Sequence, residues 1–324
     1  MKIIQVSPYF PPHLGGVEYH VKELADGLAK RGHQVTVASS CGRWNNGFVR
    51  IPSIDLFYVP IPIKRPNLEA DIYHSHVPSP LFAFNLEADI YHSHVPSPLF
   101  AFVLRDSSPH VVTYHNDVVI PGNLNGHYLP RPVGAAVEGV NRKIIRPILD
   151  RAKIVISTTK SYAETSPILK DYIHKTKIVP NAVDVSLYPR KREKKGYVLY
   201  AGRLLHYKGI ESLIQAMSEV QKKADLELVL VGDGYDRSRL EEMARRLDVR
   251  ARFTGRLDRS RFIDTLSHAE VLVLPTQNRL EAFGIVLLEA MACETPVLAF
   301  KTPGVAEVAG SKLLGWLRWQ ERGE

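Results

Sequence analysis

The sequence predicts an α/β protein made of two doubly wound domains whose parallel sheets face a cleft. Short β-rich runs alternate with helical patterns, which is typical of parallel strands joined by helical crossovers. This alternation stops at a charged run, residues 190–195, and then begins again. The length of 324 residues suits two domains of ordinary size.

The first half of the chain alternates strand and helix from its first residues. Val17, Val21, Leu24 and Leu28 form a helical stripe that ends at Gly32. Strands are expected over residues 3–6, 34–39, 110–114, 153–157 and 177–179. We therefore predict an amino-terminal domain over residues 1–183.

The second half repeats the pattern, with strands expected over residues 197–201, 226–231, 252–255, 271–275 and 296–300. Helices are expected to begin near Gly209, Asp236, Asp258 and Phe283. We predict a carboxy-terminal domain over residues 184–310, incomplete at its end, and an atypical tail over 311–324. Trp316, Leu317 and Trp319 in that tail leave apolar surface without an evident partner, which suggests truncation or a frameshift.

Residues 67–84 and 85–102 are the same 18 residues in tandem. A solenoid needs more copies, and its copies diverge from one another. We therefore interpret this identical pair as a recent duplication or a cloning error. Each copy carries one Ile-Tyr-His-Ser-His segment, with His74 and His76 in the first and His92 and His94 in the second. Only one copy is expected to occupy the sheet, with its histidine pair towards the cleft, since strand register and core accept one strand.

Composition narrows the classes of partner and compartment. The net charge of +8 is spread without a basic arm, which suits anionic small molecules or an anionic membrane surface better than sequence-specific nucleic-acid binding. General solubility explains the charge equally well. Two cysteines, no secretory signal and no run of 18 apolar residues indicate a reduced, cytoplasmic protein, with peripheral contact to the inner membrane face as an option.

Two glutamates, Glu281 and Glu289, bracket seven residues within the segment 278–291. Glu289 lies in an otherwise apolar helical run, so it must have a partner, because an unpaired buried charge is very costly. Glu281 precedes Phe283-Gly284, which can open a helix, and eight helical residues rise about 12 Å. The carboxylates would then stand about half the length of a nucleotide sugar apart, beside a helix N-terminus that attracts phosphate. A cap-side glutamate and a core glutamate paired to lysine or arginine is an equally good interpretation.

Other candidate residues follow predicted strands. Gly15 and Gly16 would let backbone N–H groups approach a phosphate, although an ordinary loop explains a glycine pair more often. Arg203 and Lys208 follow the first strand of the second domain, at the ligand edge of an open sheet, and could hold a diphosphate. His115 lies just beyond another strand end, where a lone histidine is more often structural than catalytic.

Together these motifs resemble the retaining glycosyltransferases of family 4, which have the GT-B fold of two Rossmann-like domains. The resemblance covers about residues 1–308. The matching elements, in the family's order, are Gly15-Gly16-Val17-Glu18, Thr113-Tyr114-His115, Pro180-Asn181-Ala182-Val183-Asp184, Gly202-Arg203 with Lys208-Gly209, Val231-Gly232-Asp233-Gly234, and Glu281 with Glu289. Six elements in one order are far more specific than any one of them.

The resemblance implies a role for each matching residue. Gly15 and Gly16 would approach the distal phosphate and sugar of the donor, and His115 would lie near the reacting centre. Arg203 and Lys208 would hold the diphosphate and stabilise its departure. Glu281 would contact the hydroxyls of the donor sugar, and Glu289 those of the ribose. The remaining donor-binding residues would be Arg256 and Leu257, near the base, and Phe283 and Gly284.

No Asp-x-Asp occurs in the sequence, which agrees with a metal-independent mechanism in which cationic side chains and helix N-termini act at the diphosphate. The resemblance implies no cofactor and no metal. It implies a nucleotide-sugar donor and transfer of a hexose, with retention, to a hydroxyl of a glycan or lipid-linked acceptor. The acceptor loops would be residues 8–14 and 121–132.

Three alternatives come from other classes. A nicotinamide-dependent dehydrogenase needs Gly-x-Gly-x-x-Gly, and Gly232-Asp233-Gly234 continues without the third glycine. A sugar-nucleotide epimerase shares the architecture, but the cations and the glutamate pair favour transfer. The third is a non-catalytic, sugar-nucleotide-binding remnant, because of the atypical tail.

Overall fold

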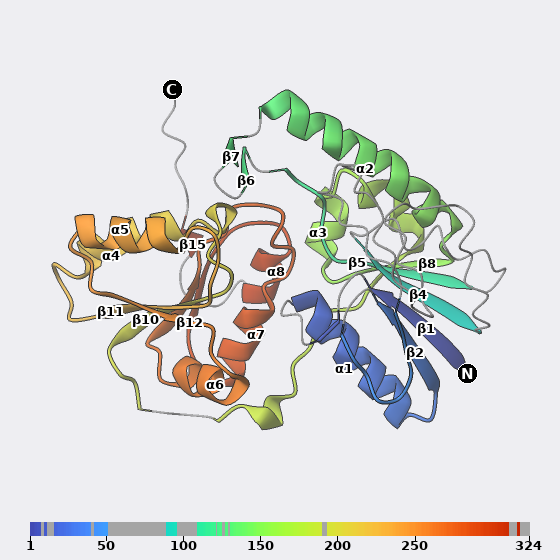
Figure 1. The fold of residues 1–324 in the computed structure, drawn as a ribbon, viewed down its shortest axis with the longest axis horizontal. Coiled ribbons are helices and arrows are strands. Elements are labelled where there is room, and N and C mark those ends of the chain that lie inside the picture. The colour runs from blue at the N-terminus through green and yellow to red at the C-terminus, as the bar shows by residue number, and fades with distance from the viewer. Residues whose placement is uncertain are drawn as a thin grey trace, which may run out of the picture. The chain divides into compact units, whose positions relative to one another are not determined.

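The computed structural model describes residues 1–7, 10–11, 16–39, 42–50, 89–95, 109–120, 122–124, 127–128, 130–189, 193–310 and 316–317. The chain forms two compact units (Figure 1). The first contains residues 1–116, 139–157 and 167–178, and the second contains residues 117–138, 158–166 and 179–324. The predicted boundary at 183/184 divides the chain close to the last of these junctions, while two earlier segments pack with the second unit.

The first unit is built on a seven-stranded sheet in the order β3-β2-β1-β4-β5-β8-β9, in which every pairing is parallel. Its strands are β1 (Lys2–Ser7), β2 (Gln34–Ser39), β3 (Phe48–Arg50), β4 (Ile90–Val95), β5 (His110–Tyr114), β8 (Ile154–Ser157) and β9 (Thr176–Ile178). Helix α1 (Gly16–Lys30) packs Val21 and Ala25 against Val35 and Val37 of β2. Helix α2 (Arg131–Arg151) has residues in both units.

The second copy of the tandem repeat supplies the central strand β4. Its register pairs Ile3 with Ile90 on one side and His94 with Thr113 on the other. Five of its six residues are buried, as expected for a parallel strand covered on both faces. Residues 90–95 of the second copy thus lie in the sheet. The first copy, residues 67–84, lies outside the described residues, so the expectation that only one copy occupies the sheet stays a prediction.

A clean deletion of 18 residues tests whether the duplication adds to the fold. Removing either copy leaves the same sequence, so the β4 pairing with β1 and β5 can form unchanged. The shorter connection between β3 and β4 costs less entropy to close. We expect an equal or higher melting temperature, measured by calorimetry. A deletion variant that does not fold would show that the extra copy is integral.

The second unit carries a six-stranded parallel sheet in the order β12-β11-β10-β13-β14-β15. Its strands are β10 (Tyr197–Ala201), β11 (Glu227–Val231), β12 (Ala251–Gly255), β13 (Val271–Leu274), β14 (Val297–Phe300) and β15 (Trp316–Leu317). Its helices are α3 (Lys160–Thr165), α4 (Ile210–Val220), α5 (Arg237–Arg246), α6 (Arg259–Ser267), α7 (Ile285–Ala292) and α8 (Val305–Ala309). A short antiparallel pair, β6 (Asn123–Leu124) and β7 (His127–Tyr128), also belongs to this unit.

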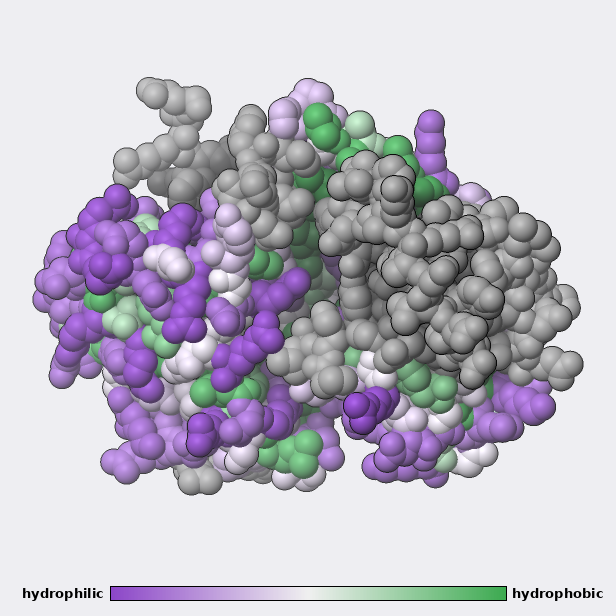
Figure 2. Space-filling model, viewed as in Figure 1, coloured by the Kyte–Doolittle hydropathy of each residue, from purple (hydrophilic) through white to green (hydrophobic). Residues whose placement is uncertain are grey.

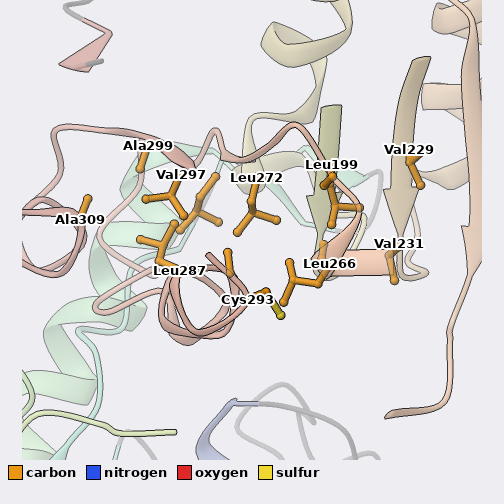
Figure 3. Packing of buried hydrophobic residues seen from close by; sticks show 14 of the residues in the cluster. Leu199, Val229, Val231, Leu266, Leu272, Leu287, Cys293, Val297, Ala299 and Ala309 are labelled. Atoms are coloured by element: carbon orange, nitrogen blue, oxygen red, sulfur yellow. The ribbon is translucent and has the colours of Figure 1, made fainter. Parts of the chain in front are cut away.

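Successive side chains of the strands of this sheet pack alternately into two hydrophobic cores. One core joins the strands to α6, α7 and α8, and its side chains point towards one another in Figure 3, among them Leu199, Leu272, Leu287 and Val297. The other joins the opposite side-chain set to α4 and α5, with Ile214 and Leu240 fully buried. Figure 2 shows mainly hydrophilic residues over α4 and α5, so these helices turn their apolar stripes to the sheet and their charges to water.

Two sequence expectations need correction. Helix α7 begins at Ile285, so Glu281 lies in the preceding loop and the interval to Glu289 is only partly helical, which removes the 12 Å estimate. In the tail, the backbone of Trp316 and Leu317 pairs with Ala299 and Phe300 as the edge strand β15, so part of this segment has a place in the sheet. The described helices include none that is both long and apolar enough to cross a membrane.

Candidate active site

The strand order of the second sheet reverses between β10 and β13, and ligands of open α/β sheets bind outside the strand ends at such a point. Lys208 follows β10 and Glu281 follows β13. Lys208 Nζ lies 2.5 Å from Glu281 Oε2, and the side chains are 13% and 17% exposed. Burial opposes the charge of Lys208, but the adjacent Glu281 carboxylate raises the pKa of Lys208 above its ordinary value. The structure thus joins two predicted site residues, 73 positions apart, in one ion pair.

Close backbone approach shapes the loops that carry this pair. Gly209, directly after Lys208, has φ +70°, and a Cβ there would lie 2.3 Å from the carbonyl oxygen of Pro275. Gly284 has φ +74°, and its Cβ would lie 2.7 Å from Leu274 Cδ2. A side chain at Gly209 would displace the backbone of Pro275, and the positive φ at both positions favours glycine, so these two residues help to fix the loops.

Arg203 is exposed, and its Nη2 donates a hydrogen bond of 2.9 Å to the Tyr207 hydroxyl. Lys208 lies over the same tyrosine ring, 5.3 Å from its centroid. One aromatic ring therefore contacts both predicted diphosphate-binding cations. Within the described part of the chain, the bond to Tyr207 is the one hydrogen bond recorded for the Arg203 guanidinium.

Glu289 is 7% exposed and already has partners within the protein. Its Oε1 accepts a hydrogen bond from Tyr188 Oη at 3.0 Å and lies 2.5 Å from Arg259 Nη1. Arg259 also bonds the Tyr188 hydroxyl and lies over its ring. Burial and the Glu289 charge raise the pKa of Tyr188. The buried Glu289 carboxylate thus has protein partners without a ligand. This agrees with the interpretation that a core glutamate pairs with an arginine.

A buried polar network holds the loop that leads to Glu281. Asp117 Oδ2 lies 3.0 Å from Arg279 Nε, and Asp117 Oδ1 accepts from Ser166 Oγ at 2.6 Å. Tyr162 Oη donates to the Arg279 carbonyl at 3.1 Å, and the Arg279 guanidinium lies 4.6 Å from the Tyr162 ring centroid. The Asp117 side chain is 3% exposed, and removing the partner of a buried carboxylate is strongly destabilising.

Histidines gather in the first unit around His115, which is 7% exposed. His94 Nδ1 lies 3.0 Å from His115 Nε2, and the two rings are stacked. His20, from α1, meets both rings edge-on at centroid distances of 5.8 and 5.3 Å. His92 stacks on His94 and bonds Thr113 Oγ1 at 2.7 Å. Burial lowers the pKa of all four histidines, that of His92 to about 3.

The other predicted residues are placed within their own units. Gly16 begins α1 in open space, with no atom within 4 Å of an added Cβ, and Gly15 lies outside the described residues. Arg256 is exposed after β12, while Leu257 packs against the core beneath it. Phe283 is buried before α7.

Sequence reasoning missed several residues that the structure brings to these sites. His20 lies four positions after Gly16, a spacing that places both on one helix face. Asp117 and Arg279 lie within two positions of the predicted residues His115 and Glu281. Arg259 and Tyr188 gave no local signal, because their contact with Glu289 is made across the fold.

Two protein-family models match the chain. "Glycosyltransferase Family 4" matches residues 14–187, and "Glycosyl transferases group 1" matches residues 188–319. The first alone spans more than half of the chain.

Several named proteins are similar in sequence. An uncharacterized glycosyltransferase of Methanocaldococcus jannaschii is 26% identical over 97% of this chain and 84% of its own length. The D-rhamnosyltransferase WbpZ of Pseudomonas aeruginosa is 29% identical over 60% of this chain and 49% of its own. One component of human phosphatidylinositol N-acetylglucosaminyltransferase is 26% identical over 96% of this chain and 64% of its own length. The matches thus span between half and most of these relatives.

Solved structures share the fold. Anabaena Alr3699/HepE, in complex with UDP and glucose, aligns with a TM-score of 0.70 at 18% identity over 98% of this chain and 85% of that chain. Sucrose-phosphate synthase of Thermosynechococcus elongatus aligns with a TM-score of 0.69 at 22% identity over 94% and 82%. Together with the two parallel sheets, these neighbours confirm the predicted GT-B fold.

Proposed function

The chain belongs to glycosyltransferase family 4, and on that premise we propose that it transfers a hexose from a nucleotide-diphosphate sugar to an acceptor hydroxyl. The proposed transfer retains the anomeric configuration and needs no metal. The acceptor is a glycan or a lipid-linked molecule. Two similar transferases whose names contain phosphatidylinositol or phosphatidyl-myo-inositol support the lipid-linked class, and with it a peripheral contact at a membrane.

The Lys208–Glu281 ion pair carries the proposal. It lies at the topological switch point, where an open α/β sheet takes its ligand. Lys208 would neutralise the charge that builds on the diphosphate as it leaves, and its pairing with Glu281 fixes its ammonium before the donor arrives. Glu281 would accept hydrogen bonds from the sugar hydroxyls. Arg203, with its exposed fork, would clamp the same diphosphate.

The first test is a donor screen followed by transfer. UDP-, GDP- and ADP-sugars are added to the full chain, and the shift in melting temperature is recorded. A donor at 100 times its dissociation constant stabilises the protein by about 2.7 kcal/mol. The stabilising donor is then incubated with glycan and lipid-linked acceptors, and the glycosylated product is detected by mass spectrometry. Absence of both donor hydrolysis and transfer, despite clear stabilisation, would support the non-catalytic alternative.

Transfer is expected to continue at an unchanged rate in excess chelator. The reason is that two cationic side chains, Arg203 and Lys208, take the place of a divalent cation at the diphosphate. The rate is measured after dialysis against chelator, with and without added magnesium or manganese. A rate that is abolished by chelator and restored by either ion would contradict the metal-independent mechanism.

Glu289→Gln separates ribose binding from a structural role. The amide keeps a hydrogen-bond acceptor for Tyr188 but loses the charge that pairs with Arg259. If Glu289 binds the ribose, the variant should bind nucleotide about 10-fold more weakly, the scale of losing a charge-assisted hydrogen bond, with little change in melting temperature. Calorimetric titration and thermal melting measure the two effects. Normal nucleotide affinity together with a much lower melting temperature would assign Glu289 to the fold alone.

A further inference from the structure

Three imidazole rings converge in the first unit from three separate elements. His20 comes from α1, His94 from β4, and His115 from the residue after β5. One ring nitrogen of each lies within 4.8 Å of one ring nitrogen of both others, and the closest pair, His94 and His115, is 3.0 Å apart. The parallel pairing of β4 with β5 fixes the backbone that carries His94 and His115, because the His115 backbone N–H donates to the carbonyl of Val95 at 3.0 Å.

The central ring of this cluster has an unmet bonding capacity. His94 is 2% exposed, and its Nε2 is buried without a hydrogen-bond partner among the described residues. A buried polar atom without a partner costs about 1–3 kcal/mol, so such atoms call for an explanation. The nitrogen of His94 that faces His115 is Nδ1, so an ion held between these two rings would bind Nδ1 and leave the ring proton of His94 on Nε2.

We propose that His20, His94 and His115 form a binding site for one transition-metal ion of the zinc class, with a fourth coordination position left to a ligand from outside the protein. Neutral imidazole is a preferred ligand of such ions, and three protein ligands with one open position are an established arrangement. A metal–nitrogen bond of about 2.0–2.1 Å places tetrahedral ligand nitrogens about 3.3 Å apart. His94 Nδ1 and His115 Nε2 are already near that spacing, and their mutual hydrogen bond is given up when both bind the ion. The half-buried His20 closes the site by a small movement of its ring.

The site has a consequence for transfer that rests on the proposed function. An ion bound to His115 occupies the histidine that we place near the reacting centre. Metal occupancy therefore inhibits a reaction that needs no metal of its own. We therefore expect transfer to resist chelator and to be inhibited by added zinc.

Direct binding tests the site without reference to activity. The full chain is freed of metal with chelator, dialysed, and titrated with Co²⁺, whose visible absorption reports its coordination geometry. We expect one equivalent to bind with an absorption typical of four or five ligands, and Zn²⁺ to displace it. His20→Ala should weaken Co²⁺ binding by at least about 10- to 100-fold, a loss that outer-shell partners alone can cause. His94→Asn, with folding verified by circular dichroism, should do the same.

His174→Ala is the matched control, because His174 is an exposed histidine of the same unit outside the cluster. It should bind Co²⁺ as the unchanged protein does. Failure to bind one equivalent of Co²⁺, or binding that survives in both His20→Ala and His94→Asn, would overturn the site.

Transfer assays test the inhibitory consequence separately. Added Zn²⁺ should lower the rate, excess chelator should restore it, and His20→Ala should lose this response relative to its own metal-free rate. Zn²⁺ that binds without slowing transfer would overturn the inhibition. A protein that binds Co²⁺ as expected but transfers no sugar under any condition would instead overturn the proposed function and leave the metal site standing.

Discussion

Lys208→Ala is expected to lower the rate of transfer by about 100-fold or more, the scale of losing one preorganised charge stabiliser. The effect has two parts. The diphosphate loses a cation. The Glu281 carboxylate, whose side chain is 17% exposed, loses the ammonium group that lies 2.5 Å from it. Steady-state kinetics with the donor found by the thermal-shift screen measures the loss, which should fall on kcat because the charge on the diphosphate builds in the transition state.

Loss of folding could imitate this result, because removing one member of a buried pair leaves an uncompensated charge. The double variant Lys208→Ala with Glu281→Gln removes that charge. It should recover the melting temperature lost in the single variant but remain inactive. Lys222→Ala, in an exposed lysine paired with Glu219, is the control and should change neither property.

Arg203→Ala should lower transfer by a similar factor with little change in stability, since Arg203 is exposed and bonds Tyr207. Turnover that is unchanged in both single variants would contradict the diphosphate assignment.

Much of the fold could be predicted because its local signals are strong. The expected strands at residues 34–39, 110–114 and 197–201 have the observed bounds, and the other expected strands agree within one residue at each end. Buried parallel strands leave continuous apolar runs, and their helices leave apolar stripes, so both can be recognised along the chain. The start of α7 was harder to predict, because Gly284 at φ +74° delays the helix and a positive φ leaves no trace in the apolar pattern.

The site could be predicted only where residues follow strand ends. Lys208 and Glu281 were predicted separately, and strand order, which the sequence does not state, brings them together. The partners of Glu289, in contrast, could not be predicted from the sequence. Burial of Glu289 predicted that a partner exists, but Arg259 and Tyr188 lie 30 and 101 positions away, and nothing local identifies them.

Asp117→Asn is expected to lower both the stability and the rate of transfer, because the Asp117–Arg279 pair braces the loop that carries Glu281. Asp117 lies two positions after His115, and Arg279 lies two positions before Glu281. In this variant Arg279 loses the Asp117 carboxylate that pairs with it. Arg279 keeps its contact with the Tyr162 ring and its 3.1 Å hydrogen bond to Thr165 Oγ1. We expect a loss of about 1–3 kcal/mol in the free energy of unfolding.

The rate should fall by about 10- to 100-fold in kcat, since a displacement of about 1 Å in a positioned group costs on that order. A double-mutant cycle with Arg279→Met tests whether the two side chains act together. A coupling of about 0.5–3 kcal/mol in stability is expected for residues in one polar network. The control is Asp171→Asn, which breaks the exposed Arg146–Asp171 pair, 2.6 Å apart with both side chains more than 40% exposed. Exposed pairs contribute about 0–1 kcal/mol, so the control should leave kcat unchanged. Additive effects of Asp117→Asn and Arg279→Met, or a normal kcat in either, would mean that this network stabilises the unit without positioning Glu281.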